Sequence, residues 1–168
     1  GTALGAIRNH CFLPWDDDID LYITRDNWTK LFDLIDQHPE VLPENRNFVC
    51  IENEKYHRNP IARYVDTTST IIYAAQSISA KTCGNQIEFF ILDPIPNVED
   101  GREDHLKEMR AFLEILSPYF ISSKRMAIQD YAEHKERVFK YYDEIEKRGY
   151  DEVMGELYDK LYTYPFEK

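Results

Sequence analysis

The stretch Pro14-Trp15-Asp16-Asp17-Asp18-Ile19-Asp20-Leu21 is the most informative part of this chain of 168 residues. It places four carboxylates within five residues, although aspartates repel one another and are depleted in β-strands. Apolar residues nevertheless flank it, with Cys11-Phe12-Leu13 before the acids and Ile23 after them. This pattern predicts a strand over about 17–24 that passes through the fold.

Alternation along such a strand puts Asp16, Asp18 and Asp20 on one face and Asp17 on the other. Three aligned acids are costly unless a cation lies against them. Carboxylate oxygens suit Mg²⁺ or Mn²⁺, which usually bind through one or two carboxylates plus substrate phosphates. We therefore predict a metal–phosphate active site in which Asp16, Asp18 and Asp20 are the candidate ligands.

The acidic run has two other interpretations. A generic run of aspartates is most often a solvated loop or the first turn of a helix, but Ile19 and the apolar flanks favour a strand here. An EF-hand loop would carry glycine at position six and glutamate at position twelve, where this chain has Leu21 and Asn27. The EF-hand is therefore excluded.

Composition narrows the class of protein. The chain is 43% hydrophobic and 14% aromatic, which predicts a folded globule of one domain. Its formal net charge of −11 argues against nucleic-acid binding, which requires a basic surface. It does not argue against small phosphorylated substrates, because a bound divalent ion reverses the local field.

Location is predicted from three features. The three cysteines have no CxxC spacing and predict buried, reduced thiols in a cytoplasmic protein. Neither a signal peptide nor an apolar run of membrane-spanning length is present, so we expect no integral membrane segment. Because the chain begins at Gly1 without a methionine, we expect further residues upstream.

Hydrophobic periodicity predicts an α+β fold, with a sheet-forming core over 1–100 and a helical extension over 101–168 packed on the same domain. Thr24 is a candidate N-cap for the second helix, and the charged helices after residue 100 are predicted to have solvated faces. The predicted helices cover 1–9, 26–37, 103–116, 124–148 and 150–161; the predicted strands cover 17–24, 48–51, 61–65 and 87–92, with 70–73 either a strand or a loop.

Further candidates for the site lie at both ends of the predicted core. Glu88 interrupts an apolar strand, so it is either a partner of the acidic cluster, as ligand or base, or an edge-strand residue facing solvent. Gly1 and Thr2 begin a helix whose free N–H groups can hold a phosphate. Arg8 either reaches the same anion or stabilises the end of that helix.

The motifs Gly1-Thr2-Ala3-Leu4-Gly5-Ala6-Ile7-Arg8 and Phe12-Leu13-Pro14-Trp15-Asp16-Asp17-Asp18-Ile19-Asp20 resemble the signature of the LicD family. That family comprises the bacterial phosphorylcholine transferases and their relatives, including the fukutin-type proteins. It belongs to the nucleotidyltransferase-fold superfamily, whose hallmark is a Gly-Gly/Ser pair followed by Asp-hydrophobic-Asp on the next strand. The later segment Ile87-Glu88-Phe89-Phe90-Ile91-Leu92-Asp93 is similar to a further family strand.

The resemblance implies a nucleotidyltransferase-like mixed β-sheet flanked by helices, and it implies roles for individual residues. Asp18 and Asp20 match the metal-binding pair, and Gly1 and Thr2 match the turn that contacts phosphate. Glu88 stands at the third carboxylate position, where aspartate is commoner.

The resemblance also implies a function. We expect Mg²⁺- or Mn²⁺-dependent transfer of a phospho-substituent such as phosphocholine, from a donor such as CDP-choline to a hydroxyl of a lipopolysaccharide or another cell-surface glycan. In this mechanism Arg8 offsets the charge of the donor phosphates. Two alternatives remain open, namely a non-catalytic nucleotide- or glycan-binding domain and a DxD-type glycosyltransferase.

Overall fold

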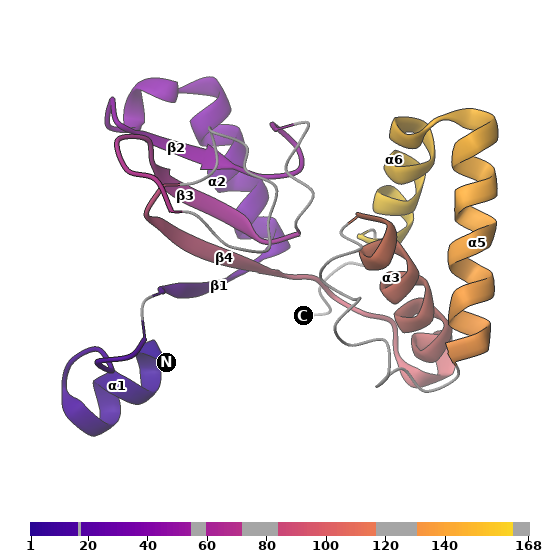
Figure 1. Cartoon of the computed structure of the whole chain (residues 1–168), viewed down its shortest axis with the longest axis horizontal. Helices are drawn as coiled ribbons and strands as arrows, with labels where there is room; N and C mark the ends of the chain where they lie inside the picture. Colours follow the sequence, from indigo (N-terminus) through magenta and orange to yellow (C-terminus); the bar gives the residue numbers. More distant parts are fainter. Residues whose placement is uncertain (17, 55–59, 72–83, 117–130, 163–168) are drawn as a thin grey trace. The chain divides into compact units, whose positions relative to one another are not determined.

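The structure is a computed structural model that describes residues 1–16, 18–54, 60–71, 84–116 and 131–162. It divides into two compact units, Gly1–Leu92 and Asp93–Lys168 (Figure 1). Among the predictions, Asp17, residues 72–73 and the first part of the 124–148 helix lie outside the described residues, as does Cys83. The packing of the helical part on the sheet core stays a prediction.

The first unit is built on a mixed sheet of four strands in the order β1-β4-β3-β2 (Figure 1). The strand β1 runs parallel to β4, whereas β4, β3 and β2 pair antiparallel. The elements are α1 (Thr2–Asn9), β1 (Asp20–Thr24), α2 (Arg25–Gln37), the 3₁₀ turn η1 (Pro39–Val41), β2 (Arg46–Val49), β3 (Ala62–Asp66) and β4 (Gln86–Leu92). The predicted α+β class and mixed sheet are confirmed.

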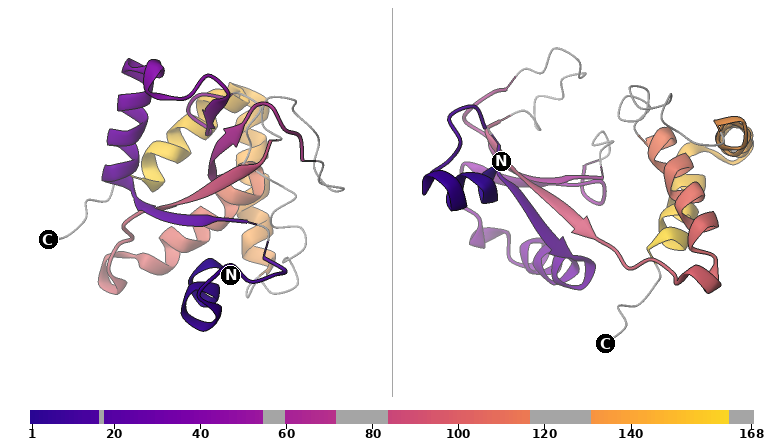
Figure 2. Two further views of the ribbon diagram at one scale, coloured as in Figure 1. Left: turned by 90° about the vertical axis from the view of Figure 1, so that its left-hand side faces the viewer. Right: turned by 90° about the horizontal axis from the view of Figure 1, so that it is seen from below.

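Helix α2 covers one face of the sheet (Figure 2), and the core of this unit lies between them. Trp28 of α2 is almost fully buried, and its ring centroid lies 6.2 Å from those of Phe48 and Phe89. Ile23 and Ile91 pack against the same cluster. Because side chains alternate along a strand, the neighbours of these core residues face the opposite side of the sheet. The sheet therefore has one apolar face under α2 and a second face that carries both polar and apolar side chains.

Two strand boundaries differ from the prediction. The first strand begins at Asp20 and not near residue 17, and the backbone at Asp16 forms a turn in which its N–H donates to the carbonyl of Leu13 at 3.1 Å. The second strand is Arg46–Val49 and not 48–51. It ends there because the Asn53 side chain accepts the N–H of Cys50 and donates to the carbonyl of Phe48, so these groups no longer extend the strand.

The cysteine prediction is right for one described residue and wrong for the other. Cys50 is buried in the core of the first unit, and this burial raises the pKa of its thiol to about 12. Cys11 is exposed, because it lies in the turn after α1 and not in a strand.

Helix α1 and the segment after it form a tight reversal. His10 ends the helix in the left-handed conformation, with φ 54°, and the chain then returns along α1. A Cβ at Gly5 would lie 2.5 Å from the Cys11 carbonyl oxygen and 2.9 Å from the Leu13 nitrogen. A Cβ at Gly1, one turn earlier, would lie 1.7 Å from a carboxylate oxygen of Asp16. The two glycines thus let the acidic segment approach the helix closely.

The second unit is a group of three described helices, α3 (Arg102–Leu116), α5 (Tyr131–Arg148) and α6 (Tyr150–Leu161), preceded by the 3₁₀ turn η2 (Val98–Asp100). Phe112 and Ile115 of α3 and Val153 and Leu157 of α6 are buried. The predicted helices 103–116 and 150–161 are confirmed. None of the described helices has both the length and the apolar character needed to cross a bilayer.

Some charged side chains of this unit pair its helices with one another. Arg137 of α5 lies 2.6 Å from carboxylate oxygens of both Asp104 and Glu108 on α3. Glu114 and His134 are buried and meet at 2.6 Å between the same two helices. Charges at helical spacing are therefore used here to pair helices, in addition to facing water.

We predict that Gly5→Ala destabilises the first unit by about 1–3 kcal/mol, because the new methyl group meets rigid backbone atoms at Cys11 and Leu13. Gly155→Ala in α6 is the control, since a Cβ there meets nothing within 4 Å. Both tryptophans belong to the first unit, so their fluorescence during urea unfolding reports on Gly5→Ala, and far-UV circular dichroism of the helices reports on Gly155→Ala. An unchanged midpoint for Gly5→Ala would contradict the close packing of α1.

Candidate metal–phosphate site

The face of the sheet away from α2 carries a row of charged side chains. Asp20 on β1, Glu88 on β4 and Arg63 on β3 are direct partners in the strand register. Neighbouring strands lie about 4.8 Å apart, so the three side chains leave the sheet side by side. The Asp20–Glu88 alignment is secured where β1 and β4 first meet, because the Glu88 N–H donates to the Ile19 carbonyl at 2.9 Å. Two carboxylates from sequence positions 68 apart are thus brought together.

Glu88 is held on one of its two oxygens. The Arg63 Nη2 and Nε atoms lie 3.1 and 3.2 Å from Glu88 Oε1, and Gln86 Nε2 donates to the same oxygen at 2.7 Å. Arg63 is 7% exposed, which is unusual for arginine, so its charge depends on Glu88 for compensation. Within the described residues, Glu88 Oε2 receives no hydrogen bond. The glutamate is therefore fixed in orientation while one oxygen stays available.

Asp16 follows α1 in the sequence but lies in space beside the N-terminal end of that helix. Its Oδ1 is 3.5 Å from the nitrogen of Gly1, and its Oδ2 is buried without a hydrogen-bond partner among the described residues. A carboxylate at this end of a helix interacts favourably with the helix dipole. The structure thus associates Asp16 with Gly1, and its role as a metal ligand stays a prediction.

The structure gives fewer contacts for the other predicted site residues. Asp18 is exposed and lies two residues before β1. Thr2 lines a hollow of about 360 Å³ beside α1, together with His10 and Phe12. Arg8 is exposed in the last turn of α1, at the opposite end of the helix from Gly1, which is the dipole-stabilising position. The roles of Thr2 and Arg8 in phosphate binding stay predictions.

The donor set fits a hard divalent cation. No group of three potential ligand side chains comes together within the part of the chain that the structure describes, which leaves out Asp17. Mg²⁺ does not require such a cage, because it usually keeps waters and binds one or two carboxylates plus substrate phosphates. Asp20 and Glu88 supply two carboxylates in register, and Asp18 lies two residues before Asp20, ahead of β1. The pair is therefore suited to a metal that a phosphorylated ligand completes.

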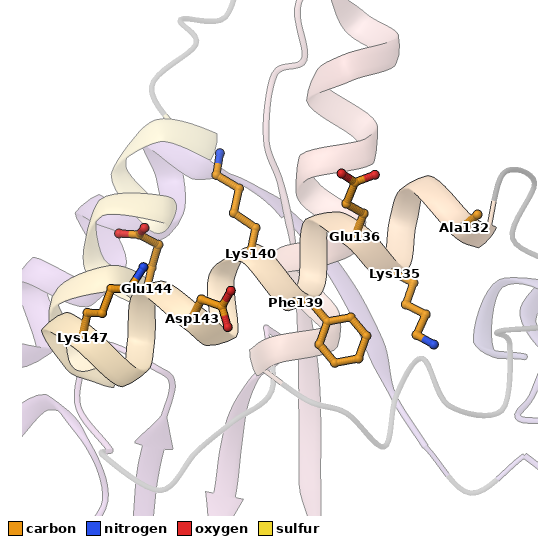
Figure 3. A pocket seen from close by; sticks show the side chains of 8 residues that line it. All are labelled: Ala132, Lys135, Glu136, Phe139, Lys140, Asp143, Glu144 and Lys147. Atoms are coloured by element: carbon orange, nitrogen blue, oxygen red, sulfur yellow. The ribbon is translucent and has the colours of Figure 1, made fainter.

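A larger hollow, of about 560 Å³, lies on the second unit and contains none of the predicted site residues. Its lining side chains all come from α5, including Lys135, Phe139 and Lys147 (Figure 3). The nitrogen of Lys135 lies 5.4 Å from the centroid of the Phe139 ring. A surface formed by one helix face does not converge on a ligand, so we do not assign the site there.

Arg63 and Gln86 are not among the predicted site residues. A signal for Arg63 is present in the sequence, because it interrupts the apolar run Ile61-Ala62-Arg63-Tyr64-Val65 much as Glu88 interrupts its own strand. Opposite charges inside two apolar strands indicate that the strands are neighbours. Gln86 carries no comparable signal, since polar residues are common at the first position of a strand.

We predict that Arg63→Met lowers the free energy of unfolding of the first unit by about 2–3 kcal/mol. This loss is somewhat less than the full cost of breaking a buried ion pair, because the Glu88 side chain is partly exposed. The double variant Arg63→Met/Glu88→Met should recover most of this loss, since no unpaired charge remains. Urea unfolding followed by tryptophan fluorescence measures both.

The control for this cycle is Arg46→Met, which removes a more exposed pair with Asp66 on the same sheet and should cost less than about 1 kcal/mol. Additive effects of the Arg63 and Glu88 substitutions in the double variant would contradict a coupled pair.

Comparison with known proteins finds similarity in the part of the chain that contains the acidic motif. Residues 1–78 match the family described as LicD/FKTN/FKRP, nucleotidyltransferase domain. A curated relative, the lipopolysaccharide cholinephosphotransferase LicD of Haemophilus influenzae, is 33% identical over 98 residues. That alignment covers 58% of this chain but 34% of the relative, so the chain spans about a third of the relative's length.

No solved structure matches the chain. The family match contains α1, the acidic motif, β1 and α2, and therefore includes the Asp20 side of the candidate site. Together, the family match and the aligned relative show that residues 1–78 of this chain are similar to the nucleotidyltransferase domain of the LicD/FKTN/FKRP family.

Proposed function

We propose that this chain is the nucleotide-binding part of a transferase that moves a phosphocholine-like group from CDP-choline to a hydroxyl of a cell-surface glycan. The observation that carries the proposal is the register of Asp20 with Glu88 beside the family's acidic motif. The name of the aligned relative supports the choice of transferred group and of lipopolysaccharide as the class of acceptor.

Asp18 and Asp20 are proposed to hold the cation, and Glu88 to complete its protein ligands. We assign Glu88 to the cation and not to proton transfer because it is the direct neighbour of Asp20 across the strands. Arg63 and Gln86 keep one oxygen of Glu88 engaged, so the other is presented in a fixed orientation. Arg63 also offsets part of the negative charge of the acidic row before any ligand binds.

A bound Mg²⁺ or Mn²⁺ would neutralise part of the negative charge on the donor phosphates. In the reaction the glycan hydroxyl oxygen forms a bond to the phosphorus of the phosphocholine group, the bond from that phosphorus to the CMP oxygen breaks, and CMP leaves. The hydroxyl proton passes to solvent or to a base outside the described residues. The chain's own contribution is to bind and orient the donor pyrophosphate at Asp18, Asp20 and Glu88.

Two alternative functions would use the same site. A DxD-type glycosyltransferase would bind a nucleotide-sugar through the same carboxylates, and a non-catalytic domain would bind a nucleotide without turnover. The family match favours the phosphotransferase over the glycosyltransferase. A cytoplasmic location also belongs to the proposal, and the free, buried thiol of Cys50 supports it, since disulfides are rare in that compartment.

We predict that Asp18→Asn and Asp20→Asn each weaken Mn²⁺ binding by more than about 10-fold. Losing a residue that only hydrogen-bonds to a metal ligand already costs about 10-fold, and losing a direct ligand should cost more. Electron paramagnetic resonance of free Mn²⁺ measures this without requiring turnover. The control is Asp36→Asn on α2, an exposed aspartate outside the site. Unchanged affinity in the Asp18→Asn/Asp20→Asn double variant would remove the assignment.

A donor panel separates the three functions. With Mg²⁺ present, release of CMP from CDP-choline, CDP-ribitol or CDP-glycerol identifies phospho-transfer, and release of UDP from UDP-sugars identifies glycosyl transfer. Binding without release identifies a non-catalytic domain and contradicts the proposed activity for this chain.

A further inference from the structure

Two aromatic side chains stand next to the Asp20–Glu88 pair. Tyr22 of β1 and Phe90 of β4 are register partners, and their ring centroids lie 5.5 Å apart with a tilt of 37°. Tyr22 is 71% exposed, although a tyrosine in a strand normally buries most of its ring. A large exposed aromatic beside a candidate site is informative, because nothing in the packing of the described sheet requires it.

The aromatic pair lies on the same face of the sheet as the acids. Tyr22 follows Asp20 by two residues and Phe90 follows Glu88 by two, so each shares the face of its predecessor. The intervening residues, such as Phe89, face the core under α2. The face away from α2 therefore presents an acidic row and, one strand period further on, an aromatic row.

We propose that Tyr22 and Phe90 bind the quaternary ammonium group of the choline donor, an inference that rests on the proposed function. A cation over an aromatic face is attracted by the quadrupole of the ring, and quaternary ammonium groups are commonly recognised in this way. A strongly exposed tyrosine ring supplies such a face, and the neighbouring carboxylates add long-range attraction for a positive group.

The spacing of the two rows fits phosphocholine. Residues two apart on a strand are separated by about 6.5–7 Å. The phosphorus and nitrogen of phosphocholine are joined by four bonds of about 1.5 Å each, which span roughly 5 Å when extended. A donor whose phosphate is held at Asp20 and Glu88 thus brings its ammonium group to Tyr22 and Phe90. The aromatic row determines which transferred group is accepted, and the acidic row holds the phosphates.

The test compares two donors of equal shape. CDP-choline carries a positive nitrogen, and the 3,3-dimethylbutyl ester of CDP carries a neutral carbon in its place. By calorimetry with Mg²⁺, the unaltered chain should prefer CDP-choline by about 3- to 30-fold, the range expected for cation–π recognition. Tyr22→Leu should reduce this preference to nearly 1, whereas Tyr22→Phe should retain it.

Tyr142→Leu is the control, because Tyr142 is an exposed tyrosine of α5 in the other unit. It should leave the preference unchanged. Phe90→Leu is the second variant and should lower the preference in part. Tryptophan fluorescence during unfolding checks that each variant is folded.

The outcomes separate this inference from the function on which it rests. Absence of any Mg²⁺-dependent binding of CDP to the unaltered chain would contradict the proposed function itself. Binding of CDP together with equal affinities for the two donors would overturn only the assignment of Tyr22 and Phe90. The assignment is also overturned if Tyr22→Leu keeps the preference, or if it weakens both donors equally, since Tyr22 then supports packing and not recognition of a cation.

Discussion

The repulsion among Asp16, Asp18, Asp20 and Glu88 is the constraint on which the first unit depends. Of these acids, Asp20 and Glu88 come together because β1 and β4 pair in parallel in this register. The fold reduces the electrostatic cost in two ways. Asp16 lies at the start of α1, where the helix dipole favours a negative group, and the buried Arg63 pairs with Glu88. Asp18 and Asp20 receive neither form of compensation from the described residues, and a divalent cation would supply it.

The same constraint explains why small residues precede the acidic motif. Gly1, the N-cap of α1, and Gly5 stand one turn apart, and the returning segment passes so close that a Cβ at either position would collide with it. The left-handed His10 turns the chain back toward the helix start. Glycines, reversal and acids therefore act as one local unit, which brings Asp16 to Gly1 before the strand begins. The family match over residues 1–78 includes all of these features.

Much of this architecture is predictable from the sequence, because it follows from local periodicity. The apolar face of α2 and the nearly continuous apolar character of β4 follow directly from residue spacing. The start of β1 is predicted too early, since alternation around Ile19 resembles a strand although Asp16 is held in a turn. The end of β2 is missed because it depends on the Asn53 side chain. The Arg63–Glu88 contact is not predicted because pairing of β3 with β4 is a long-range property.

The central claim is that Asp20 and Glu88 share a divalent cation on the face of the sheet away from α2. Anomalous diffraction from crystals of this chain grown with MnCl₂ and CDP-choline tests it most directly. The account predicts an anomalous peak within about 2.0–2.2 Å of a carboxylate oxygen of each residue, as in oxygen-ligated sites of small divalent ions. Ordered Mn²⁺ elsewhere on the chain, with Asp20 and Glu88 both resolved and unliganded, would contradict it.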